Sequence, residues 1–479
     1  MGRVAAVTAV VSTGLIGTAL PVPAGEPAVD WRPCEPDTSV ECGVVAVPLV
    51  PGDAGSGSID IAVARVPARD QARRIGVLLF NPGGPGGPGA AMFANGAAEL
   101  LFPELLERFD LVSFDPRGTG GSHQLSCGPV LSPGEPVFPG SPGDFYTMVE
   151  NSRAMGDECL DTHGELVRHV DTVAVAHDMD AIRAALGEEQ INYLGVSYGT
   201  HLGVTYAEYF PERVREMVLD GPVDHGSGAA RFTLEEAAAM EDGFDRFAEW
   251  CAEDSSCALH GRDVGEVYDT LVSRADTAPI PAPDAGDGVT VNGDTIRMAL
   301  PVFLPTMRLL GDTWGPLAQA LAAADEGDAS AFAGGASMVG FPVSAYTAVS
   351  CMDFPPQFSG YADAALRLSL ARVVAPRVGA AVEGWAMSAS CAGWPIEPTN
   401  PWAPVDVDGT APILIASNTD DPATPLAGAR RLAREIAGSG LLVTQTYGHT
   451  SYYNSACARA EEIGYLITGE LPEVDTCPN

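Results

Sequence analysis

Residues 191–209 read INYLGVSYGTHLGVTYAEY, a short apolar run, a serine between two glycines, and a longer amphipathic stretch. The run predicts a buried strand and the later stretch predicts a helix. Gly195 to Gly199 matches G-x-S-x-G, in which a tight turn raises the serine hydroxyl above the sheet. This pattern also occurs by chance, so Ser197 is either an ordinary turn residue or a nucleophile. The strand before it and the helix after it favour the nucleophile.

The sequence on both sides of this stretch alternates between strand-like and helix-like segments. Such alternation predicts an α/β fold with a mostly parallel sheet flanked by helices. Two earlier runs separated by Gly, Ser and Pro predict a hairpin, at 43–50 and 59–66. The further strands are expected at 75–80, 109–115, 214–221, 411–418 and 441–448, and helices at 173–187, 425–438 and 454–468. Residues 128–145 are rich in Pro and Gly and are expected to form a loop.

The middle of the chain differs in character, because Ala-rich helical patterns dominate from about 225 to 400. We therefore expect one α/β sheet domain in two parts, 25–224 and 401–479, split by a helical cap at 225–400. Residues 1–24 have one charge, a short apolar stretch and small residues before Ala24, which is typical of a signal peptide cleaved near that residue. A membrane anchor is the alternative, but the apolar run is short and ends at Pro21.

Composition narrows the class of protein further. With 26 basic and 63 acidic residues the formal charge is −37, which disfavours binding to nucleic acid or to an anionic membrane surface. The basic residues are all arginines, so chemistry that needs a lysine is excluded. Ten cysteines in an exported chain predict disulfides, and we expect neighbours in the sequence to pair, although sequence alone does not fix the connectivity. No metal-binding spacing is evident, and we expect no cofactor.

A serine nucleophile requires a base and an acid that orients it, and in this fold the chain order is Ser, acid, His. His449 follows the last predicted sheet strand, at the edge where a base can reach Ser197. His201 lies one helical turn after Ser197 and is expected to serve packing. The acid is expected directly after the strand 411–418, where Asp420 and Asp421 are adjacent.

The oxyanion of an acyl-transfer intermediate requires backbone N–H donors. One is expected from Tyr198, the residue after the nucleophile. The other is expected from the loop after the strand 75–80, where Gly83, Gly84 and Gly86 allow the backbone to approach a substrate. We select Gly84 as this second donor.

These residues together resemble the α/β-hydrolase serine peptidases related to proline iminopeptidase, and more closely the secreted tripeptidyl aminopeptidase family. The resemblance rests on NPGGPGGPG, DPRGTGGS, LGVSYGTHLGVTYAEYFPERVREMVLDGPVD, DDPATPLAGARRLA and GHTSY, in the expected order over most of the chain. It implies Ser197, Asp421 and His449 as the triad, because the family's acid directly precedes proline. Relatives with HGGPG have histidine where this chain has Pro82, so contacts made by that histidine are not carried over.

The resemblance implies a secreted exopeptidase that releases short peptides from free N-termini. Such an enzyme must bind an ammonium group, for which Asp224 and Asp353 are candidates, although either carboxylate could equally serve a loop or a helix cap. The expected partners are peptides, and the oligomeric state stays open. An esterase or lipase on the same scaffold is the alternative, and a non-catalytic binding protein is disfavoured by the intact triad residues.

Overall fold

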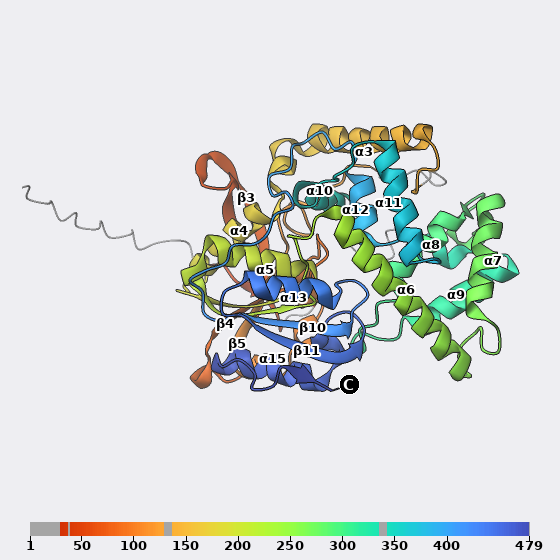
Figure 1. Ribbon diagram of the computed structural model, residues 1–479. Helices are drawn as coiled ribbons and strands as arrows, with labels where there is room; N and C mark the ends of the chain where they lie inside the picture. Colours follow the sequence, from red (N-terminus) through yellow and green to blue (C-terminus); the bar gives the residue numbers. More distant parts are fainter. Residues whose placement is uncertain (1–28, 37–38, 129–136, 335–342, 479) are drawn as a thin grey trace, which may run out of the picture.

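The computed structural model describes residues 29–36, 39–128, 137–334 and 343–478 (Figure 1). The predicted signal peptide and its cleavage site near Ala24 lie outside the described residues. In the described part of the chain, no helix combines the length and the apolar character needed to cross a bilayer.

A single twisted sheet forms the centre of the core, and in the described ranges it has ten strands. Their order is β1-β2-β3-β5-β4-β6-β7-β10-β11-β12, antiparallel from β1 to β5 and parallel from β5 to β12. The predicted hairpin is confirmed as β2 and β3. The strands are β1 (Arg32–Pro33), β2 (Glu41–Val50), β3 (Asp53–Val66), β4 (Gly76–Asn81), β5 (Phe109–Phe114), β6 (Ile191–Val196), β7 (Val214–Asp220), β10 (Leu414–Asp420), β11 (Gly440–Tyr447) and β12 (Thr476–Cys477).

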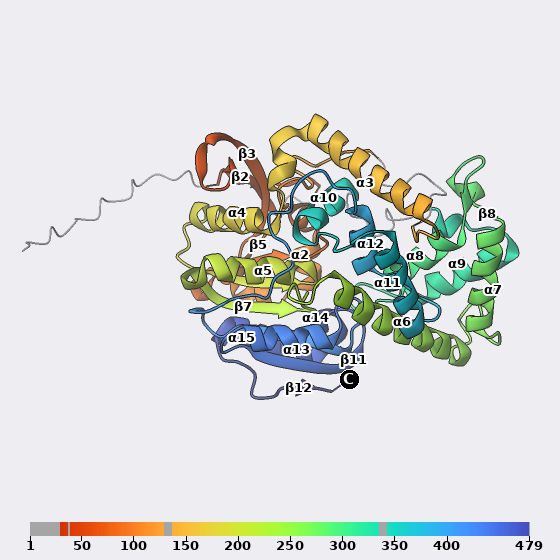
Figure 2. The ribbon, with the colours of Figure 1, turned by 45° about the horizontal axis from the view of Figure 1, so that its top comes forward.

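Helices cover both faces of this sheet, which explains why β4, β5 and β6 are buried along their whole length and mostly apolar. One apolar layer joins the sheet to α4 (Thr172–Ala185), α5 (Tyr198–Tyr209) and α13 (Leu426–Glu435). The opposite layer joins it to α1 (Gly89–Ala94), α2 (Ala97–Leu101), α14 (Ser451–Asn454) and α15 (Ala456–Thr468) (Figure 2). The predicted α/β-hydrolase class with a mostly parallel sheet is therefore confirmed.

A group of helices, which we call the cap, lies between β7 and β10 in sequence and beside the carboxyl ends of the strands in space (Figure 1). Most of its apolar side chains form a core of their own, whereas residues of α10 and Met387 of α12 pack in the layer that contains α5. The predicted limits of the insertion, 225 and 400, stay predictions. The cap contains α6 (Ala229–Glu253), α7 (Val264–Thr277), β8 (Ile280–Pro281), β9 (Thr290–Val291), α8 (Gly293–Phe303), α9 (Trp314–Glu326), α10 (Val343–Asp353), α11 (Tyr361–Val374) and α12 (Glu383–Ser390).

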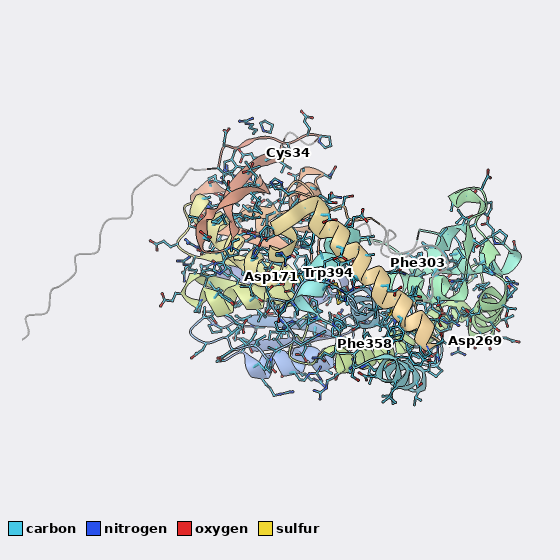
Figure 3. All side chains as sticks on the ribbon, turned by 90° about the horizontal axis from the view of Figure 1, so that it is seen from above. Cys34, Asp171, Asp269, Phe303, Phe358 and Trp394 are labelled. Carbon is cyan, nitrogen blue, oxygen red and sulfur yellow. A yellow bond between two sulfur atoms is a disulfide. The ribbon has the colours of Figure 1, made fainter. Side chains whose placement is uncertain are left out.

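A long helix, α3 (Pro142–His163), was not expected from the sequence. It begins inside the segment assigned to a loop, because Ser141 caps it by accepting a hydrogen bond from the amide of Asp144 and Pro142 fits the first turn. The helix crosses the molecule from the core, near Trp394, to the cap, near Phe358 (Figure 3). The loop prediction is therefore wrong for residues 142–145.

The ten cysteines form five disulfides between neighbours in the sequence, as expected. The pairs are Cys34–Cys42, Cys127–Cys159, Cys251–Cys257, Cys351–Cys391 and Cys457–Cys477. The fourth pair ties α10 to the end of α12, two cap helices that lie over the site described next.

Candidate active site

Ser197 occupies a strained turn between β6 and α5. Its backbone angles are φ 56° and ψ −129°, which a residue with a side chain adopts only when the surrounding structure enforces them. A Cβ on Gly195 would lie 2.4 Å from the carbonyl oxygen of Gly199, and one on Gly199 would lie 2.8 Å from the carbonyl oxygen of Asn81. Both glycines are therefore sterically required, and the turn presents a half-buried serine at the end of a buried strand.

Asp421 and His449 form a tightly held pair at the ends of β10 and β11. Nδ1 of His449 lies 3.0 Å from each carboxylate oxygen of Asp421. The carboxylate also accepts the amides of Ala423, Thr424 and Thr450, so its orientation is fixed. These bonds assign the Nδ1 proton to the Asp421 side and leave Nε2 as the free nitrogen of the ring.

Asp420 has a different environment from its neighbour. Its carboxylate is partly exposed and lies 3.2 Å from the guanidinium of Arg246. Asp421 is 1% exposed. The two adjacent acids therefore point to different partners, and only Asp421 contacts the imidazole.

The end of β7 brings Ser197 and His449 to the same place. The amide of Ser197 donates to the carbonyl of Asp220, the last residue of β7. A Cβ on the next residue, Gly221, would lie 3.2 Å from Cε1 of His449. Within the described residues the Ser197 hydroxyl has no hydrogen-bond partner, and bonds between nucleophile and base often tighten only when substrate is bound.

The pKa of His449 lies above its usual value of 6.5. Burial of the ring opposes protonation, but the charge and hydrogen bond of Asp421, together with the charges of Asp220 and Glu383, outweigh it. Burial also raises the pKa of Asp220 to about 6. The imidazolium form is therefore stabilised by the surrounding carboxylates, as a base that accepts a proton requires.

The loop after β4 lies directly against Ser197. A Cβ on Gly83 would lie 3.0 Å from Cβ of Ser197 and 3.3 Å from the amide nitrogen of Tyr198. The Gly83 amide donates to Asn81, whereas the described part of the chain offers no acceptor to the amide of Gly84. Tyr198 begins α5, so its N–H is not used within the helix. This arrangement is compatible with Tyr198 and Gly84 as oxyanion donors, an assignment that stays a prediction.

The two acids selected as ammonium acceptors are already bonded to other groups. Asp353 is fully buried, and it accepts hydrogen bonds from Thr172, the Tyr198 hydroxyl and Asn400. Burial raises its pKa to about 7. Asp224 forms an ion pair with Arg431. Neither carboxylate is left open toward the catalytic residues.

His201 is buried and stacks on His225 with ring centroids 4.1 Å apart. Burial lowers the pKa of His201 well below its usual value, so the ring is neutral. This geometry confirms the expected packing role.

Two glutamates that the sequence analysis did not select lie above the site. Glu236 on α6 accepts the amides of Glu383 and Gly384 at the start of α12, at 2.9 and 2.8 Å. Glu383 is half-buried and accepts the Tyr346 hydroxyl at 2.7 Å. The amide nitrogen of Tyr346 would lie 3.4 Å from a Cβ on Gly86 in the loop after β4. We call Glu236 and Glu383 the cap glutamates.

The cap glutamates interact electrostatically with His449 and Asp421. Burial raises the pKa of both groups, and the negative charge of Glu383 raises that of Glu236 further. The charge of Glu383 acts on His449, and that of Asp421 acts on Glu236. No sequence signal separates these residues from ordinary acidic positions on helices, because they are 147 residues apart and meet only through the fold.

Comparisons with known proteins agree with this geometry. Residues 76–279 match a family model described as alpha/beta hydrolase fold, and residues 378–478 match one described as TAP-like protein. The chain is 32% identical to tripeptidyl aminopeptidase of Streptomyces lividans, over 95% of this chain and 87% of that protein. The chain belongs to the TAP-like family of α/β hydrolases. The expected family and enzyme class are therefore confirmed, and the chain is an enzyme of the serine-peptidase type.

Other TAP-like relatives carry different names. Serine protease Hip1 and carboxylesterase B, both of Mycobacterium tuberculosis, are each 32% identical over 94% of this chain and 90% of the relative. The family name alone therefore leaves the substrate of this TAP-like chain to be argued from its site.

Proposed function

We propose that this TAP-like protein is a secreted exopeptidase that removes tripeptides from free N-termini through an acyl-enzyme. The observation that carries the proposal is the pair of cap glutamates, because the charge of Glu383 acts on His449 and its partner Tyr346 lies against the loop after β4. The name of the Streptomyces relative suggests the tripeptide product. The five disulfides suit an oxidising compartment outside the cytoplasm.

The proposed reaction uses the triad in two steps. His449 Nε2 accepts the hydroxyl proton as Ser197 Oγ attacks the scissile carbonyl, and the amides of Tyr198 and Gly84 bind the oxyanion. His449 then donates this proton to the leaving amine, and the C–N bond breaks. Water, activated by the same imidazole, hydrolyses the ester to release the peptide and restore Ser197. Asp421 holds the ring and stabilises its charged form throughout.

An aminopeptidase needs a negatively charged group that binds the ammonium of the substrate's N-terminus. The cap glutamates can supply this group. Two neighbouring carboxyl groups in a buried place resist ionisation together, as their raised pKa values show. A substrate ammonium would neutralise this charge and gain strong hydrogen bonds, because charge-assisted bonds are worth more away from water. Glu383 is the half-buried member and is therefore the group we expect to contact the ammonium.

The proposal predicts that peptides are cleaved only with a free N-terminus. Hexapeptides should release a tripeptide, and N-acetylation should lower kcat/KM by about 100-fold, since a charge-assisted contact is lost. Glu383→Gln should raise KM for the free peptides by about 10- to 100-fold. Mass spectrometry of the products and steady-state kinetics measure both effects.

Glu235→Gln is the matched control, because Glu235 adjoins Glu236 on α6 but pairs with Arg431. It should leave KM unchanged. Equal cleavage of free and acetylated peptides would rule out the aminopeptidase function.

The esterase alternative is supported by the relative named carboxylesterase B. It predicts turnover of short acyl esters with no release of peptides from any amide substrate. The same preparation, assayed with p-nitrophenyl esters and with hexapeptides, separates the two functions.

The pH dependence of the reaction follows from His449. The imidazole must be neutral to accept a proton, and its pKa is raised above 6.5 by the surrounding carboxylates. We therefore expect kcat/KM on a tripeptide anilide to fall as the pH drops through a value above 6.5. A pH–rate profile measures this, and an acidic limb centred below 6 would contradict the assigned environment of the base.

A further inference from the structure

A groove of about 590 Å³ lies between the cap and the core, beside the catalytic loops. One wall is the end of α6, which runs from the strand ends outward along the cap (Figure 1). The loop 304–314 and the end of β11 complete it. The residues that matter for its chemistry are Arg246, Trp250, Glu253, Thr306, Trp314 and Tyr447.

The groove shares its walls with the loops that hold the acid and the base. Tyr447 precedes His449 by two residues, and the carbonyl of Thr306 accepts the amide of His449 at 2.9 Å. Arg246 pairs with Asp420, the neighbour of the catalytic acid. A chain lying in this groove would therefore lie next to the histidine that protonates the leaving amine.

Three aromatic rings form part of the groove lining. The ring of Trp314 lies 5.8 Å from that of Trp250 and 5.5 Å from that of Tyr447, measured between centroids. The Trp314 indole N–H and the Tyr447 hydroxyl both donate to the carbonyl of Leu304, which fixes both rings. All three rings are half-buried, so part of each is open to a ligand.

Charged groups of both signs surround these rings. The guanidinium of Arg246 lies 5.7 Å from the Tyr447 centroid, and the opposite charge comes from residues such as Glu253. Aromatic rings together with charged groups of both signs suit an organic ligand with apolar and polar parts, such as a peptide, better than a single ion.

The position of His449 indicates which side of the scissile bond the groove would bind. The leaving amine departs on the side of His449, at the β11 end of the row β4-β6-β7-β10-β11. Tyr346, which holds Glu383, lies against Gly86 after β4, at the other end of that row. The groove therefore lies on the β11 side of Ser197, and Tyr346, the hydrogen-bond partner of Glu383, lies on the β4 side.

We propose that this groove binds the polypeptide on the leaving side of the scissile bond and favours a large apolar or aromatic side chain there. The proposal rests on the peptidase function proposed above. It adds a binding site for the part of the substrate that is not released as the tripeptide. It also makes long polypeptides better substrates than short amides with the same N-terminal tripeptide.

Two substrates with one N-terminal tripeptide test this proposal. The first ends in p-nitroanilide and has no leaving chain, and the second continues for six residues that include phenylalanine. Trp250→Ala should lower the ratio of kcat/KM for the extended peptide to that for the anilide by about tenfold, as truncation of a central aromatic contact does. Trp250→Phe, which retains packing against Phe247, should give a smaller change in the same direction.

Leu310→Ala is the control, because this exposed residue lies on the same loop but outside the groove lining. It should leave the ratio unchanged. An unchanged ratio in both Trp250 variants, with anilide turnover showing that they are folded, would overturn the proposal. If acetylated and free peptides are cleaved equally, the ammonium contact fails, yet the ratio still reports on the groove.

Discussion

Replacing Ser197 by alanine is expected to lower kcat on a tripeptide anilide by about 10⁴- to 10⁶-fold. The hydroxyl is the only nucleophile of the proposed acyl transfer, and removing it leaves the oxyanion donors and substrate binding as the only sources of rate enhancement. The fold should be unaffected, because within the described residues the hydroxyl makes no hydrogen bond and alanine retains the Cβ that the turn already accommodates.

The measurement is steady-state turnover with thermal unfolding as the check on folding. Ser369→Ala is the control, because Ser369 is exposed on α11 and only bonds a backbone carbonyl. It should leave both turnover and the melting temperature unchanged. A Ser197→Ala protein that retains more than about a tenth of the activity would contradict the assigned nucleophile.

Asp421→Asn is expected to lower kcat by about 10⁴-fold. Its carboxylate accepts from Nδ1 of His449 and holds the proton on that nitrogen. An amide in its place can present N–H to the ring, which favours the wrong tautomer and removes the charge that stabilises the imidazolium. The remaining acidic limb of the pH–rate profile should also move to lower pH, because this charge raises the pKa of His449.

The neighbouring acid provides a matched control for this change. Asp420→Asn removes a carboxylate of the same size one residue away, and that carboxylate makes a partly exposed pair with Arg246 and accepts the Thr419 hydroxyl. Surface pairs contribute little, so the change in kcat should be less than about threefold. A larger loss of kcat in Asp420→Asn than in Asp421→Asn would mean that Asp420, and not Asp421, is the acid that orients His449.

The proposed triad could be assembled from the sequence because each of its three members follows a strand. In a parallel sheet the carboxyl ends of the strands share one edge. Residues that directly follow the strands, such as Ser197, Asp421 and His449, are therefore brought to the same edge, however long the sequence between them. The choice between Asp420 and Asp421 required more than this topology. It came from the resemblance to a family whose acid precedes proline.

Other parts of the site could not be predicted, because they depend on contacts between distant segments. Glu236 and Glu383 are unremarkable acidic residues until the cap folds and places one at the start of the helix that contains the other. Asp224 and Asp353 were reasonable candidates for binding the substrate ammonium. In the structure, however, Asp224 forms an ion pair with Arg431, and Asp353 accepts a hydrogen bond from Thr172. Helix α3 was missed because its start looks like a Pro-rich loop.

Covalent labelling with a diphenyl phosphonate reports whether three side chains far apart in the sequence make one serine alcohol nucleophilic. Peptide mapping by mass spectrometry identifies the labelled residue, and the rate of labelling reports on the imidazole. We expect a single phosphonate ester on Ser197, formed far more slowly in Asp421→Asn. Labelling at another residue, or none on a preparation that cleaves peptides, would contradict this expectation.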